Sequence, residues 1–190
     1  MTNKIKVLAF AGSLRVGSYN KALVRAAVEV APPMVTIATY DLEGIPLYNA
    51  DLETNLPPKV EEFKEKIRDS DALLIATPEF NYSLSGVLKN ALDWASRPPK
   101  GNPLEGKPVA IMSASGGRFG GARAQYHLRQ VFVFLDMHPI NHPEVMLSDA
   151  SNNIDEKGNL TNQQTRQLIR QLLESLTTWT TKLQTKSQQQ

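Results

Sequence analysis

The stretch Ile5-Lys6-Val7-Leu8-Ala9-Phe10-Ala11 is followed directly by Gly12-Ser13-Leu14-Arg15-Val16-Gly17-Ser18-Tyr19-Asn20. The first part is a short apolar run closed by a glycine, which predicts a buried strand. From about Asn20 the pattern becomes helical, and one face carries Leu23, Val24, Ala27 and Val28. Residues 12–19 therefore leave a strand and enter a helix, at the edge where open parallel sheets bind ligands.

This first loop is suited to a phosphate group. Free backbone N–H groups and the helix dipole at a helix N-terminus favour an anion. Ser13, Ser18 and Asn20 add neutral donors, and Arg15 adds a charged fork that can pair with two phosphate oxygens. Ser18 or Asn20 could also act as a simple helix cap. Capping needs neither Arg15 nor so many hydroxyl groups, so the pattern favours phosphate binding.

Two common nucleotide motifs do not fit the first loop. Gly12 and Gly17 have the spacing of a Walker A loop, but Ser18 stands where that motif needs a lysine. The dinucleotide pattern G-x-G-x-x-G is also absent from the loop. A monophosphate is therefore favoured over a nucleoside triphosphate.

A second loop follows the predicted strand at 71–77, which Pro78 ends because proline has no N–H for the ladder. Its residues Glu79-Phe80-Asn81-Tyr82-Ser83 are polar and aromatic, and a helix is expected over 84–94. Exposed backbone there could pair with the edge of a pyrimidine-like ring while Phe80 or Tyr82 covers a face. The alternative is a turn whose aromatic rings close the core.

A third loop, 113–121, follows the predicted strand at 108–112 and contains four glycines. Glycine allows close approach of the backbone to a ligand, although a flexible loop would show the same composition. Three such loops at the carboxyl ends of three strands define one crevice. A phosphate site beside a site for a flat polar ring predicts flavin mononucleotide, FMN, and hence redox chemistry.

Three motifs in this order carry a resemblance to a known family. They are Gly12-Ser13-Leu14-Arg15-x-Gly17-Ser18-x-Asn20, Pro78-Glu79-Phe80-Asn81-Tyr82-Ser83-x-x-Gly86-x-Leu88-Lys89-Asn90-Ala91-x-Asp93-Trp94, and Gly120-Gly121-Ala122-Arg123-x-Gln125-Tyr126-His127-Leu128-Arg129-Gln130. Over about residues 4–150 the chain resembles the NAD(P)H-dependent FMN reductases, especially the chromate and quinone reductase branch. The resemblance implies a flavodoxin-like α/β sandwich with tightly bound FMN. We expect a five-stranded parallel sheet with helices on both faces.

The resemblance also implies a set of site residues. The FMN phosphate would be held by Ser13, Arg15, Ser18 and Asn20. The ribityl chain and isoalloxazine would be lined by Pro78, Glu79, Phe80, Asn81, Tyr82 and Ser83. The ring would be bordered by Ser113, Ser115, Gly116 and Gly117. Phe80 stands where the family usually has tyrosine, which removes one hydroxyl group. The helix with Arg123 and Tyr126, together with Glu144, would face a neighbouring subunit in a homodimer or homotetramer.

The expected reaction follows from the cofactor. NADPH or NADH would pass a hydride to flavin N5 and leave, and a small quinone-type acceptor would then be reduced; chromate, azo compounds or free flavin are further candidate acceptors. The chemistry would occur on the FMN, so no catalytic side chain is named.

Two alternatives to this function remain. One is a flavodoxin-type electron carrier, although such carriers are typically strongly acidic and this chain has a net charge of +2. The other is a non-redox module that binds a different phosphorylated ligand.

The rest of the chain continues the alternation of strand and helix. Strands are expected at 35–39 and around 137–147, and helices from Pro58, over 122–136, and after a capping box formed by Thr161 and Gln164. We expect one domain over 1–185 and a polar tail at 186–190.

Composition excludes several classes of protein. The 190 residues include no cysteine, so disulfides, thiol nucleophiles and cysteine-ligated clusters are ruled out, and a reducing compartment such as the cytoplasm is expected. No basic stripe suggests nucleic acid, and no apolar run reaches membrane-spanning length. The three histidines have no metal-ligand spacing, so no metal site is expected.

Overall fold

The structure, a computed structural model, describes residues 4–187. Its main sheet contains β1 (Ile5–Ala11), β2 (Val35–Tyr40), β3 (Ala72–Thr77) and β6 (Pro108–Ala114), in the spatial order β2-β1-β3-β6. All these pairs are parallel, and every residue of β3 and β6 is buried. Strands buried on both faces read as continuous apolar runs, which is why the sequence identified them.

The far edge of the sheet is occupied by two short strands. β7 (His138–Pro139) pairs with Pro108–Val109 of β6, and β8 (Val145–Leu147) pairs with Met112–Ala114 of the same strand. The sheet therefore has six strands in five positions, and the expected count of five was too low by one. Pro139 lacks the N–H that a ladder needs, which accounts for the interruption of this edge.

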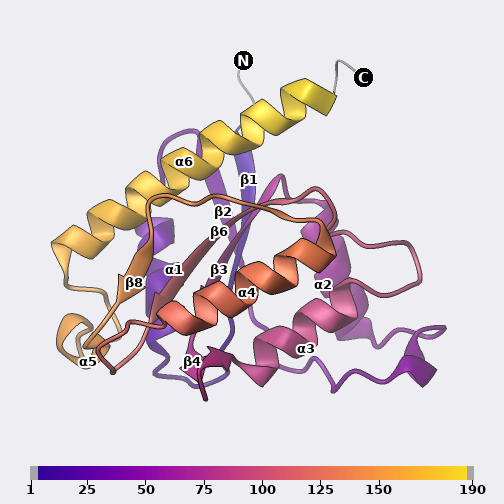
Figure 1. The fold of residues 1–190 in the computed structure, drawn as a ribbon, viewed down its shortest axis with the longest axis horizontal. Coiled ribbons are helices and arrows are strands. Elements are labelled where there is room, and N and C mark those ends of the chain that lie inside the picture. The colour runs from indigo at the N-terminus through magenta and orange to yellow at the C-terminus, as the bar shows by residue number, and fades with distance from the viewer. Residues whose placement is uncertain (1–3, 188–190) are drawn as a thin grey trace.

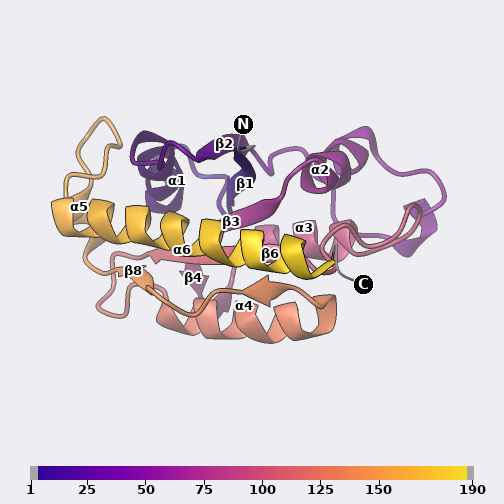
Figure 2. The same cartoon turned by 90° about the horizontal axis from the view of Figure 1, so that it is seen from above.

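Helices cover both faces of the sheet, and the flavodoxin-like fold is confirmed (Figures 1 and 2). One apolar cluster joins the sheet to α1 (Tyr19–Glu29) and α6 (Gln163–Ser187). The other joins it to α2 (Pro58–Arg68), α3 (Gly86–Ala95) and α4 (Ala122–Leu135). Side chains of a strand alternate between faces, so Val7 and Ala9 enter the first cluster while Leu8 and Phe10 enter the second.

Several element boundaries differ from the expectations. The helix expected at 84 begins at Gly86, because 79–84 form a two-stranded ribbon of β4 (Glu79–Phe80) and β5 (Ser83–Leu84). The capping box at Thr161 and Gln164 was wrong, since the Asn162 side chain accepts the Thr165 N–H at 2.8 Å instead. Short helical turns lie at η1 (Ala50–Leu52) and α5 (Ala150–Asn153).

The C-terminal helix extends further than expected. α6 continues to Ser187, so the first two residues of the expected polar tail are helical. The remainder of that tail, 188–190, lies outside the described residues.

Candidate functional site

The three loops singled out from the sequence lie together at the carboxyl edge of the sheet. β4 marks this edge at the bottom of Figure 1, at the opposite end of the sheet from the start of β1. The first and third loops are joined by Asn20, whose side chain makes two hydrogen bonds of 3.0 Å with the backbone of Ala114. The start of α1 and the beginning of the third loop are therefore held side by side, as a shared site would require.

The first loop presents anion-binding groups at the start of α1. Ser18 is buried and caps the helix, accepting the Lys21 N–H at 3.3 Å, while Ser13 is half-buried. Arg15 is exposed with its guanidinium 4.9 Å from the Tyr19 ring centroid, and no carboxylate pairs with it in the described part of the chain. An unpaired guanidinium beside a helix N-terminus is suited to a phosphate.

The second loop is a β-hairpin with a two-residue turn. Asn81 and Tyr82 both have positive φ, 49° and 65°, as a type I′ turn requires. Phe80, Asn81 and Tyr82 are exposed, Pro78 is buried, and the half-buried Ser83 lies 3.0 Å from His127 Nδ1 on α4. The aromatic side chains at 80 and 82 therefore project from the core and do not close it.

Ser85, which the sequence analysis did not identify, holds the first loop against the second. Its hydroxyl donates to the Gly12 carbonyl at 2.6 Å and accepts the Leu88 N–H at 3.1 Å. A Cβ atom on Gly12 would lie 2.8 Å from Leu88 Cβ, so only glycine permits this approach. A serine directly before a helix is a cap signal, but it was hidden by placing the helix start at 84.

The third loop is anchored by a buried hydroxyl. Ser113 is fully buried, donates to the Gly120 carbonyl at 2.6 Å, and accepts from Gln125 Nε2 at 2.8 Å. The half-buried Ser115 accepts the Gly117 N–H at 3.1 Å, and Gly116 and Gly117 are exposed. Ser113 and Gln125 thus fix the base of the loop, whereas residues 115–117 form its rim. Sequence reasoning missed the role of Gln125.

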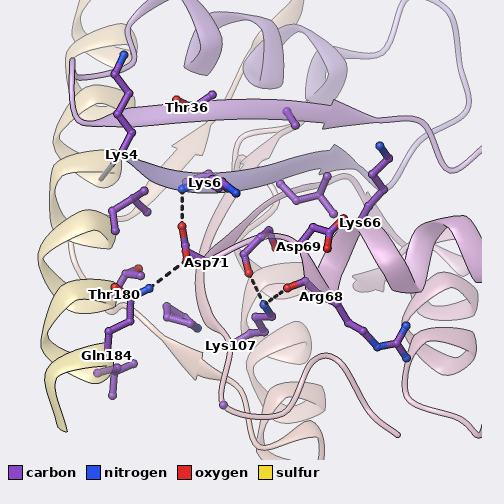
Figure 3. Close-up of a pocket in the computed structure, with 18 of the residues that line it drawn as sticks. Lys4, Lys6, Thr36, Lys66, Arg68, Asp69, Asp71, Lys107, Thr180 and Gln184 are labelled. Carbon is purple, nitrogen blue, oxygen red and sulfur yellow. Dashed lines mark hydrogen bonds between the residues drawn. The ribbon is translucent and has the colours of Figure 1, made fainter. Parts of the chain in front are cut away.

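A large groove of about 1330 Å³ lies at the opposite, amino-terminal edge of the strands (Figure 3). Several of its polar groups are engaged in structural contacts. Lys107 donates to the carbonyls of Arg68 and Ser70 at the end of α2, and burial lowers its pKa. Asp71 accepts the Lys6 N–H at 2.7 Å. Lys107 thus satisfies carbonyl groups at a helix end. Ligands of open α/β sheets bind at the carboxyl edge of the strands, so the three loops are the better candidate for the ligand site.

Two kinds of feature are absent from the described residues. Within 4–187 no group of three or more potential ligating side chains could hold a metal ion. No helix over the same range is both long and apolar enough to span a bilayer.

The order of the sheet defines a flavodoxin-like protein, and the first two loops flank the β1/β3 switch point, where such folds bind ligands. The chain belongs to the NADPH-dependent FMN reductase family, whose model matches residues 5–152.

Three relatives show how closely the chain fits that family. It is 56% identical to an NAD(P)H-dependent FMN reductase of Pseudomonas aeruginosa over 184 residues, covering 96% of this chain and 99% of that protein. It is 48% identical to an NADPH:quinone oxidoreductase of Arabidopsis thaliana over 189 residues, covering 96% and 95%. The solved structure of the NAD(P)H:(acceptor) oxidoreductase FerB from Paracoccus denitrificans matches with a TM-score of 0.85 and 31% identity, covering 94% and 98%.

Proposed function

We propose that this chain is an FMN-dependent NAD(P)H oxidoreductase that reduces a quinone-type acceptor. The observation that carries the proposal is the meeting of three loops at one edge of the sheet, where Asn20 joins the first loop to the third and Ser85 joins the first to the second. Membership of the FMN reductase family and the quinone reductases among the relatives support it.

The residues present fit FMN in their chemistry. We assign the phosphate to Arg15, Ser13 and the backbone N–H groups that open α1, with Ser18 and Asn20 shaping that loop. We assign the ribityl chain and isoalloxazine to the second and third loops, that is to Pro78, the backbone of Glu79, Phe80, Asn81, Tyr82, Ser83, Ser115, Gly116 and Gly117, with Ser113 supporting from below; the Glu79 carboxylate itself is paired with Arg123. Ser113 is given a supporting role and not a direct contact with the ring, because its side chain is fully buried. The continuous sheet supports treating 1–185 as one domain.

The protein's own contribution to the reaction is binding and orientation. Bound FMN supplies the hydride chemistry. Arg15 and the helix N-terminus neutralise the phosphate, and backbone N–H groups of the loops can stabilise negative charge on the ring. The exposed rings of Phe80 and Tyr82 leave an apolar surface on which a flat donor or acceptor can stack. Proximity of the two reactants is then the main source of rate enhancement.

The proposal is tested by the visible spectrum of the purified protein, reconstituted with FMN and then treated with NADPH or NADH without oxygen. Flavin bands that bleach, and return when a quinone is added, are expected. Bands that persist with both nicotinamides would indicate an electron carrier. A protein that takes up no FMN would show that the crevice holds another ligand.

We also propose that the chain forms at least a homodimer through α4. Tyr126, Val133 and Phe134 lie on one face of that helix at i, i+7 and i+8, and the last two are 82% and 80% exposed. Monomers rarely expose apolar surface of this kind on a regular helix. Glu144 is also exposed, so it can serve a subunit contact, whereas Arg123 is already paired within the chain.

A further inference from the structure

The carboxylate of Glu79 is bound to α4 instead of facing the turn that it precedes. It pairs with the guanidinium of Arg123 through both Nε and Nη2, and it accepts the backbone N–H of Arg123 at 3.0 Å. The Glu79 side chain is only 7% exposed, so this contact is shielded from water on one side. A charge-assisted pair with several hydrogen bonds in such a place holds a fixed geometry.

The same guanidinium stacks on two aromatic rings from different loops. Its central carbon lies 3.7 Å from the ring centroid of Tyr82, in the hairpin turn, and 4.8 Å from that of Phe119, in the third loop. Both rings are exposed, so the core does not fix their positions. Arg123 is therefore in contact with both the second and the third loop.

We propose that Arg123 is a positioning residue for the flavin, which sets the separation and orientation of the hairpin 79–84 and the glycine-rich loop 115–121. The inference rests on the proposed function, because it places the isoalloxazine between those loops. Arginine is required for this role, since only a planar fork can pair with Glu79 and stack on two rings at once. Lysine would retain the charge but would lose the stacking geometry.

The test compares variants of Arg123 with a variant of Arg129. Arg129 lies on the same helix, but it bonds Asn141 at 3.1 Å and the Ile140 carbonyl at 3.1 Å, on the side of β7. Each purified protein is measured for the Kd of FMN, for the visible circular dichroism of the bound flavin, and for its thermal unfolding midpoint.

We expect R123A to raise the Kd of FMN at least tenfold and to change the visible circular dichroism. R123K should recover part of the affinity but not the spectrum. E79Q, which keeps the shape but removes the charge, should raise the Kd several-fold and provides the test if R123A does not fold. R129A should lower the unfolding midpoint without moving the Kd or the spectrum.

A folded R123A or E79Q whose Kd and spectrum match the wild type would overturn the proposal. Equal changes in R123A and R129A would also overturn it, because they would reflect general weakening of α4. These outcomes differ from failure of the proposed function, in which the wild-type protein itself binds no FMN or is not reduced by NAD(P)H.

Discussion

The side-chain amide of Asn20 makes two hydrogen bonds with the backbone of Ala114, donating to its carbonyl and accepting its N–H, both at 3.0 Å. Asn20 is 2% exposed in the first turn of α1, and Ala114 is the last residue of β6. One side chain thus completes the ladder at a strand end and joins two loops that are 94 positions apart. Its position joins the first loop and the glycine-rich third loop into a single unit.

Asn20→Ala should therefore destabilise the FMN-free protein. The substitution leaves the buried N–H and carbonyl of Ala114 without partners, at a cost of about 1–3 kcal/mol for each group. We expect the free energy of unfolding, measured by urea denaturation, to fall by about 2–6 kcal/mol. Asn20→Asp should lower the free energy of unfolding at least as much as Asn20→Ala, because it turns a carboxylate oxygen toward the Ala114 carbonyl.

Asn152→Ala is the matched control, since Asn152 is an exposed asparagine on α5. It should change the free energy of unfolding by no more than about 0.5 kcal/mol. If Asn20→Ala behaved like this control, the double hydrogen bond would not be what joins the loops.

The layers of the fold and the edge that holds the site could be predicted because their signals are local. The apolar runs at 5–11, 71–77 and 108–112 each form a buried strand within a residue or two of the expected bounds. Each is followed by a loop of distinctive composition, and parallel strands bring such loops to one edge. The helix over 122–135 was also predicted, despite the strand-like run at Val131–Phe134.

The contacts between loops could not be predicted from one sequence. Glu79 meets Arg123 across 44 positions, and nothing local indicates which of many distant cations a carboxylate will pair with. The hairpin at 79–84 was missed because its turn residues are Asn81 and Tyr82, whereas the strong signal for a type I′ turn is Asn-Gly. Tyrosine at positive φ is held there by its tertiary contacts.

Arg15→Ala should weaken FMN binding through the phosphate alone. A charged hydrogen-bonded partner contributes about 1.5–3 kcal/mol, which corresponds to a rise in Kd of roughly 10- to 150-fold. Riboflavin, which lacks the phosphate, provides the control ligand. Fluorescence titration should show that its affinity is unchanged in the variant. An equal loss of affinity for FMN and riboflavin would mean that Arg15 contacts the ring or supports the folded structure. An unchanged affinity for FMN would mean that Arg15 is not part of the site.

Lys64 should make stability depend on pH above neutrality. It is 1% exposed on α2 and donates to the Arg97 carbonyl, and burial lowers its pKa to about 8 from an ordinary value of 10.5. Below pH 8 the Lys64 amine is charged in both the folded and the unfolded protein, so burial of the charge opposes folding. Between about pH 8 and 10.5 the folded protein releases the proton while the unfolded chain keeps it, so this penalty declines.

Lys64→Met removes the buried charge at the cost of one hydrogen bond to Arg97. We expect the variant to be more stable than wild type by about 1–2 kcal/mol at pH 7, and the difference to vanish or reverse by about pH 10. Urea denaturation at several pH values measures this. Lys66→Met, on the exposed side of the same helix, should show no such trend. A difference that is constant with pH would mean that Lys64 is already well solvated or paired.

Phe134→Glu should separate the subunits if α4 forms the dimer contact. A charge within an apolar interface loses its water on association without gaining a partner, which costs several kcal/mol for each subunit. Size-exclusion chromatography with light scattering should therefore show a monomer at micromolar concentration. Its unfolding midpoint at low protein concentration should be close to that of dissociated wild type, because Phe134 is exposed in the single chain.

Val28→Glu provides the comparison, because Val28 is an exposed apolar residue on α1, on the other face of the sheet. This variant should keep the wild-type mass. If instead Phe134→Glu remains a dimer and Val28→Glu does not, the contact lies on the face formed by α1 and α6. If wild type is itself a monomer at all concentrations, the apolar face of α4 serves another partner. Only dissociation specific to the α4 substitution agrees with the proposed interface.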